Sequence, residues 1–238
     1  MLRKKWFEYL IEFAFVFLAV YLGIVGDNLR VQKLEDEQGK IYVSSIINDL
    51  AADTTNLSIV LKEFVIKDIN IDTVLLMYDK LTTGYNDTFW RNFYSLQKYP
   101  DFICTDQTIQ QLKNIGGMQL IKSKVALYEI TKYDSKLKKL ALVLESLDER
   151  YTKIRDLKYE IIDVKNLKLD KSIMSIEKIE KEAKNYLLID NKATIGKLYN
   201  VIQDYQNVMG FVMDQEKKIR QEAIDLILLL KKEYHLNK

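Results

Sequence analysis

One apolar stretch near the N-terminus constrains this chain more than any other feature. The sequence opens with MLRKK and continues with WFEYLIEFAFVFLAVYLGIV, residues 6–25. A helix of that length rises by about 30 Å, the thickness of the hydrocarbon core of a bilayer. The stretch is apolar on every helical face, which favours lipid, although a buried core helix of a soluble protein is the alternative. We therefore predict an uncleaved transmembrane helix over 6–25.

Two acidic residues, Glu8 and Glu12, lie four positions apart and so share one face of this predicted helix. The Phe, Leu, Ile and Val residues favour insertion by about 4–7 kcal/mol, whereas one central acid costs about 2.5–3.5 kcal/mol. Insertion therefore tolerates Glu12. A carboxyl group at that depth indicates either a functional role, such as ion coupling or pairing with a basic group of a partner, or a protonated side chain that hydrogen-bonds between anchor helices. Both interpretations predict an intramembrane polar contact with another protein.

The flanks of the stretch predict its orientation. Three basic residues precede it, whereas residues 26–40 carry three basic and four acidic residues. The positive-inside rule then places residues 1–5 in the cytoplasm as a short stub. Residues 26–238 would form one extracytoplasmic domain. In a Gram-negative bacterium this domain lies in the periplasm, and residues 6–25 anchor it in the inner membrane.

The composition of the rest of the chain favours an all-α fold. Eight glycines and one proline in 238 residues leave few tight turns. In helices predicted from 123 and from 192, apolar residues recur in steps of three and four, from Ile130 to Val164 with one stutter and from Ile195 to Leu230, a coiled-coil spacing. We predict that the anchor continues without a hinge into a helix over 27–67, and that the long helices form an elongated bundle or coiled coil whose stripes require partners.

Shorter elements are predicted between the long helices. Asp72 would cap a helix over 70–83, and Gly116-Gly117 would end a helix over 105–113. Ser123 would cap the helix that follows. Another short helix is predicted over 173–187, linking two antiparallel long helices.

Two further sets of residues are candidates for function. The aromatic segment 85–102 could line a small-molecule pocket or cap the bundle, and its candidate pocket residues are Trp90, Phe93, Tyr94 and Tyr99. Glu216 occupies a core position of the last heptad stripe between Val212 and Ile219. A polar residue in such a position typically sets helix register.

Several classes of function find no support in the residue types. Charges balance, with 36 Lys and Arg against 34 Asp and Glu, so nucleic acid is not an expected partner. The single Cys104, which we expect to be a buried thiol, cannot form an intramolecular disulfide, and His235 has no second histidine for a metal site. We predict no catalytic residues, no metal and no cofactor, hence not an enzyme.

The segments KKWFEYLIEFAFVFLAVYLGIVGDN and TIQQLKNIGGMQLIKSK, the latter at 108–124, resemble an uncharacterised family of Gram-negative bacterial proteins. Members have one N-terminal span and a helical periplasmic domain. The matching residues include Glu12-Phe13 and Gly116-Gly117, whereas the Asn-Asn-Trp-Asn that often ends the family's anchor is replaced by Asp27-Asn28-Leu29-Arg30. The resemblance implies a topology and a helical domain, and no activity.

These observations predict a membrane-anchored structural or accessory subunit. Its partners would be the lipid bilayer and either further copies of itself or a membrane protein of a cell-envelope complex, which the anchor and the heptad stripes would contact. The alternative is a periplasmic ligand-sensing helical module that binds a small molecule near 85–102 and signals through a partner protein.

Overall fold

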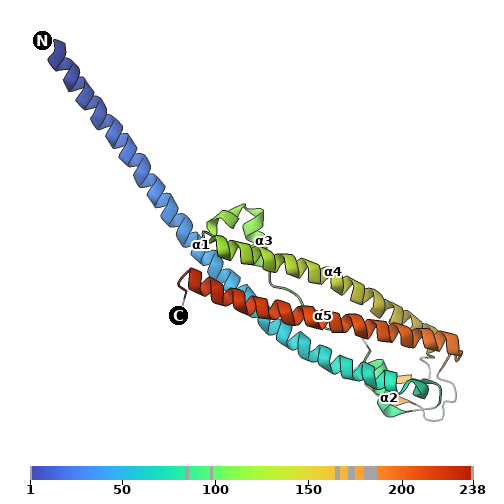
Figure 1. The fold of residues 1–238 in the computed structure, drawn as a ribbon. Coiled ribbons are helices and arrows are strands. Elements are labelled where there is room, and N and C mark those ends of the chain that lie inside the picture. Colours follow the sequence, from blue (N-terminus) through green and yellow to red (C-terminus); the bar gives the residue numbers. More distant parts are fainter. Residues whose placement is uncertain are drawn as a thin grey trace. The chain divides into compact units, whose positions relative to one another are not determined.

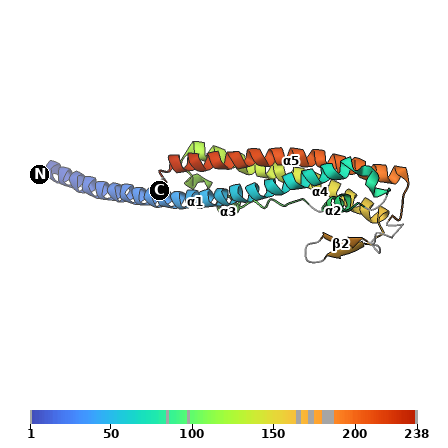
Figure 2. The same ribbon diagram turned by 90° about the horizontal axis from the view of Figure 1, so that it is seen from below.

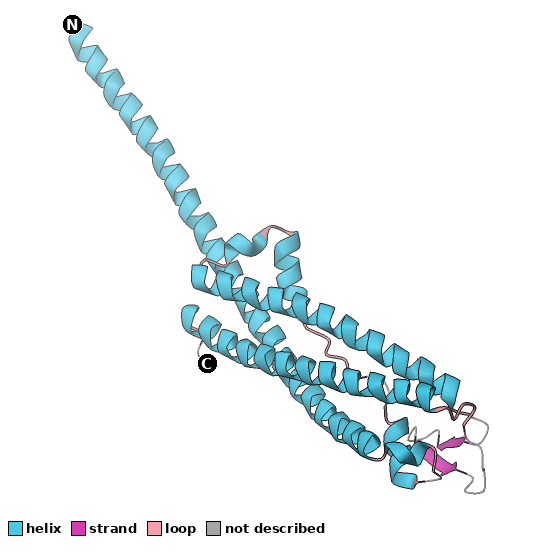
Figure 3. Cartoon of the chain, turned by 45° about the vertical axis from the view of Figure 1, so that its right-hand side comes forward, coloured by secondary structure: helices cyan, strands magenta, loops and turns pink. Residues whose placement is uncertain are grey.

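The structure, a computed structural model, describes residues 2–83, 86–96, 99–163, 167–170, 175–179 and 187–236, with side chains described from residue 9 onwards except between 164 and 186. The fold is all-α, as the sequence predicts, with one small hairpin (Figures 1 and 3). Its helices are α1 (Leu2–Leu76), α2 (Asp87–Tyr94), α3 (Gln107–Asn114), α4 (Lys124–Ile161) and α5 (Lys192–Glu233), with the 3-10 turns η1 (Tyr78–Leu81) and η2 (Gly117–Leu120).

The described chain forms two compact units. The first comprises Met1–Asp49, Asp106–Glu129 and Leu228–Lys238, and the second comprises Leu50–Thr105 and Ile130–Ile227. The helix α1 is continuous from Leu2 to Leu76, which confirms that the apolar N-terminal stretch passes into the following helix without a break. No proline occurs in this helix, so no backbone N–H is missing from its hydrogen-bond ladder.

Three helices pack together in the second unit. Ion pairs join Lys136 to Glu222 and Arg150 to Asp204, so α4 and α5 run antiparallel, as predicted. Arg220 of α5 donates to Ser58 Oγ of α1 at 2.7 Å, and Gln206 donates to Asp68 at 2.9 Å, so α1 is also antiparallel to α5. Views along two directions show these helices side by side (Figures 1 and 2).

The apolar stripes of α4 and α5 are largely buried within the chain itself. Ile130, Leu147 and Ile154 of α4 are at most 2% exposed. Leu198, Met209 and Val212 of α5 are fully buried. We predicted that these stripes require partners. The partner of the two stripes is α1 of the same chain, which contributes a third stripe of buried residues. Its buried residues follow the same three-four spacing: Val43, Ile46, Leu50, Asp53, Leu57, Val60, Phe64, Lys67, Ile71 and Val74.

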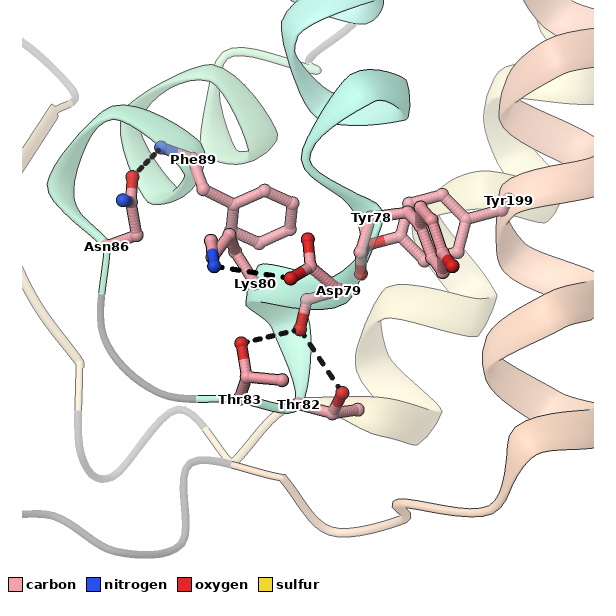
Figure 4. A network of polar contacts seen from close by, with 8 residues as sticks. All are labelled: Tyr78, Asp79, Lys80, Thr82, Thr83, Asn86, Phe89 and Tyr199. Carbon is pink, nitrogen blue, oxygen red and sulfur yellow. Dashed lines mark hydrogen bonds and ion pairs between the residues drawn. The ribbon is translucent and has the colours of Figure 1, made fainter.

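The end of α1 differs from the prediction. Asp72 lies inside α1 and caps no separate helix over 70–83, because the buried stripe holds the chain helical as far as Leu76. The chain then tightens into η1, where the hydroxyls of Thr82 and Thr83 donate to the carbonyl oxygen of Asp79 (Figure 4). Asn86 Oδ1 accepts from the N–H of Phe89 at 2.9 Å and so caps α2 (Figure 4).

The helix predicted over 173–187 is wrong where the structure describes this segment. Strand β1 (Leu167–Asp170) pairs antiparallel with β2 (Ser175–Ile179), as the magenta arrows in Figure 3 show. Apolar and polar residues alternate in β1, a period of two that suits a strand. In β2 the apolar residues Ile176 and Ile179 lie three positions apart, and the pairing with β1 carries a register shift between Lys168 and Leu169. The remainder of the predicted helix lies outside the described residues.

In the first unit, short elements cover α1 closely. Thr108, in the first turn of α3, donates its N–H to Asp49 Oδ2 of α1 at 3.2 Å. The predicted stop at Gly116-Gly117 is confirmed, since Gly116 takes the left-handed conformation with φ of 67° after α3. Ser123 Oγ accepts from the N–H of Ala126 at 3.2 Å, which confirms it as the cap of α4.

Candidate functional site

The most conspicuous surface of the chain is the apolar N-terminal part of α1. Phe13, Phe15 and Phe17 are 71%, 69% and 63% exposed, and the large apolar residues between Tyr9 and Ile24 are exposed on all sides of the helix. This part of α1 is long and apolar enough to cross a membrane. Exposed apolar surface of this extent is typical of a membrane or protein contact.

The predicted intramembrane acids lie on this helix. Glu12 is exposed, and the described part of the chain provides it with no hydrogen-bond partner. Glu8 belongs to α1, but its side chain lies outside the described residues. The intramembrane polar contact of both residues stays a prediction.

The four candidate pocket aromatics pack against one another and against neighbouring rings. The Trp90 and Phe93 centroids lie 5.7 Å apart in an edge-to-face arrangement, and Trp90 is 6.1 Å from Tyr94. Tyr99 stacks on Phe64 of α1 at 6.5 Å and donates to the carbonyl oxygen of Leu144 at 3.3 Å. Because Trp90 and Phe93 are fully buried, this geometry is that of a packed aromatic cluster.

A lysine approaches the aromatic cluster from α4. Lys158 Nζ lies 4.8 Å from the Phe93 ring centroid and 5.1 Å from that of Tyr94, and it donates to the carbonyl oxygen of Phe93 at 2.9 Å. The ammonium thus sits at the C-terminal end of α2, where a cation is favourable. Burial, together with the smaller effect of the nearby Lys67 charge, lowers the pKa of Lys158 to about 7. Burial also lowers the pKa of Lys67 to about 8.

Glu216 lies in the core of the second unit, where the heptad spacing places it. Its side chain is 0% exposed, and neither carboxyl oxygen has a hydrogen-bond partner among the described residues. Burial raises the pKa of Glu216 to about 8. A protonated carboxyl is therefore the favoured form at neutral pH. The register-setting role of Glu216 stays a prediction.

A second polar position in the core was missed by the sequence analysis. Asp53 of α1 is 1% exposed and accepts from the Tyr133 hydroxyl at 3.0 Å and from the N–H of Thr105 at 2.7 Å. Burial raises the pKa of Tyr133, and the negative charge of Asp53 is the next largest cause. The continuous heptad spacing of α1 could have revealed this position. Cys104, next to Thr105, is only half-buried, which corrects the expectation of a buried thiol.

Among the residues that the structure describes, no group of three or more His, Cys, Asp or Glu side chains could hold a metal ion. Asp53 instead joins α1 to α4 through its hydrogen bond with Tyr133. No protein-family model, curated protein sequence or solved structure matches this chain.

Proposed function

We propose that this protein is a membrane-anchored accessory subunit of a bacterial cell-envelope complex. Residues 6–25 span the inner membrane, residues 1–5 stay in the cytoplasm, and the helical domain over 26–238 lies in the periplasm. The observation that carries the proposal is the apolar part of α1, whose side chains from Tyr9 to Ile24 are exposed, next to a basic N-terminal flank. Lipid would remove this surface from water.

In this proposal the anchor, residues 6–25, is the part of the chain that contacts the partner. The stripes of α4 and α5 are largely covered within the chain, so they offer little apolar surface to another subunit. Glu12, in contrast, lies on an exposed apolar helix and would need a polar neighbour in lipid. The partner is a second copy of this chain or another membrane protein. The aromatic cluster does not support the ligand-sensing alternative, because its central rings, Trp90 and Phe93, are fully buried and pack against each other.

A topology experiment tests the proposal. Alkaline phosphatase fused after residue 238 should be active, and a fluorescent protein that matures only in the cytoplasm should be dark at the same position. A matched chain in which Arg3, Lys4 and Lys5 are changed to Glu should lose part of the phosphatase activity, because the basic flank sets the orientation. A bright fluorescent fusion on the unchanged chain would contradict the proposed orientation. Recovery of both fusions from the soluble fraction would contradict the anchor.

A further inference from the structure

A surface groove between α4 and α5 is not used by the proposed function. It has a volume of about 410 Å³ and lies entirely within the second unit. Pockets that bind small organic ligands have volumes of about 300–1,000 Å³. The lining residues come from two helices: Lys136, Lys139, Leu140 and Val143 from α4, and Phe211, Gln215, Lys218, Ile219 and Glu222 from α5.

The floor of the groove is apolar. Leu140 and Ile219 are 3% and 4% exposed, so their side chains close the bottom. Phe211 is 53% exposed and lines the side of the groove. Val143 is half-buried beside them. A ligand that covers this floor must bring an apolar part of its own.

The rim of the groove is basic. Three lysines and one acid line it. Lys136 is paired with Glu222, and Lys218 is paired with Asp214 at 2.6 Å. Lys139 has no ion-pair partner among the described residues, and Gln215 has no hydrogen-bond partner there. Lys139 of α4 and Gln215 of α5 therefore each bring a hydrogen-bond donor to the groove.

We propose that this groove binds a fatty acid, that is, a single acyl chain with one carboxylate. The acyl chain lies against Val143 and the exposed Phe211 ring, above the buried Leu140 and Ile219, and the carboxylate accepts from Lys139 Nζ and the Gln215 side-chain amide. The charge of the rim selects an anion, and the small volume suits one chain rather than a partner helix. This site goes beyond the proposed accessory role and does not depend on the orientation of the anchor.

Photoaffinity labelling tests the site on the full chain in phosphatidylcholine nanodiscs. The probe is a twelve-carbon fatty acid with a diazirine near its methyl end, and labelled peptides are located by mass spectrometry. We expect the peptides that contain Val143 and Phe211 to be labelled. Dodecanoate should compete, and dodecanol should not. Competitors should gain about tenfold in affinity for every two methylene groups until the groove is filled.

Variants give the expected and the contradictory results. Lys139→Glu should reduce groove labelling about tenfold, and Val143→Trp should abolish it by filling the floor, whereas Lys153→Glu, an exposed site on α4 outside the groove, should change nothing. Labelling of the 6–25 peptide measures the probe in lipid and serves as an internal reference. The proposal is overturned if groove labelling survives Lys139→Glu and Val143→Trp. It is also overturned if label is as strong at Tyr199, which lines a second hollow of about 420 Å³.

Discussion

The hydroxyl of Tyr133 donates to Oδ2 of Asp53 at 3.0 Å and so links the core positions of α4 and α1. The other carboxyl oxygen of Asp53 accepts from the N–H of Thr105 at 2.7 Å, so one buried side chain connects two helices and the segment after α2. A buried carboxylate is tolerated only when its lone pairs are satisfied. This arrangement makes Asp53 a specific contact in an otherwise apolar stripe.

Asp53→Ala should therefore destabilise the domain by about 2–4 kcal/mol, because it leaves the Tyr133 hydroxyl and the Thr105 N–H without this acceptor. Tyr133→Phe should cost about 1 kcal/mol. Urea unfolding at pH 7 measures both, and a double-mutant cycle isolates their coupling. Tyr159→Phe on the exposed face of α4 is the matched control and should have no effect. Additive effects of the two changes would show that the hydrogen bond contributes nothing.

Glu216 predicts an unusual pH dependence. Its pKa of about 8 in the folded chain exceeds its ordinary value of 4.5, so the folded chain binds the proton more tightly than the unfolded chain. Its contribution to stability is therefore full below about pH 4.5 and is lost as the pH rises to about 8. Glu216→Gln should remove this contribution to the dependence of the unfolding free energy on pH. Glu216→Leu should in addition raise the unfolding free energy at pH 8 by about 2–4 kcal/mol.

Thermal unfolding between pH 5 and pH 9 checks this prediction. Glu149→Gln changes an exposed carboxyl of α4 and should leave the pH profile as it is. Parallel profiles for the unchanged chain and Glu216→Gln would mean that the buried carboxyl does not titrate in this range.

The heptad spacing of α4 and α5 made their existence and their core faces predictable, including the position of Glu216. The core stripe of α1 was harder to recognise, because Asp53 and Lys67 interrupt its apolar pattern. Only the tertiary contacts of Asp53 explain why a polar residue belongs there. Asp72 has a local preference for a helix N-cap, but it lies inside α1. Its neighbours Ile71 and Val74 are buried, and this packing keeps the segment helical as far as Leu76.

The hairpin of β1 and β2 shows the opposite error. Lys and Glu favour helices in isolation, and their abundance over 177–184 suits the helix predicted over 173–187. Apolar and polar residues alternate only in Leu167–Asp170, and the pairing of this segment with Ser175–Ile179 makes both of them strands. Of the aromatic residues predicted to line a pocket, Trp90, Phe93 and Tyr94 lie together, but a sequence cannot tell whether rings face a ligand or one another.

A substitution at Gly39 tests the close approach of η2 to α1 in the first unit. A Cβ atom at this position would lie 2.3 Å from the carbonyl oxygen of Leu120, a distance that requires backbone to move. Gly39→Ala should therefore lower the unfolding free energy by about 1–3 kcal/mol despite the better helix propensity of Ala. Gly196→Ala in α5 meets no atom within 4 Å and should stabilise by about 0.5–1 kcal/mol. Equal effects of the two substitutions, measured by urea unfolding, would contradict the close contact.

Glu12 tests whether the anchor contacts another protein. A carboxyl facing acyl chains costs more than one packed against a neighbouring helix, so we expect Glu12 to contact a second copy or a partner subunit in the membrane. Glu12→Leu should improve membrane insertion and shift the complex in mild detergent to smaller species, whereas Glu12→Gln keeps the hydrogen-bonding capacity and should preserve assembly. Light scattering after size exclusion measures the mass, with Glu37→Leu beyond the apolar stretch as the control. Because the stripes of α4 and α5 are largely covered within the chain, an unchanged mass for Glu12→Leu would remove the main structural argument for an anchor-mediated complex.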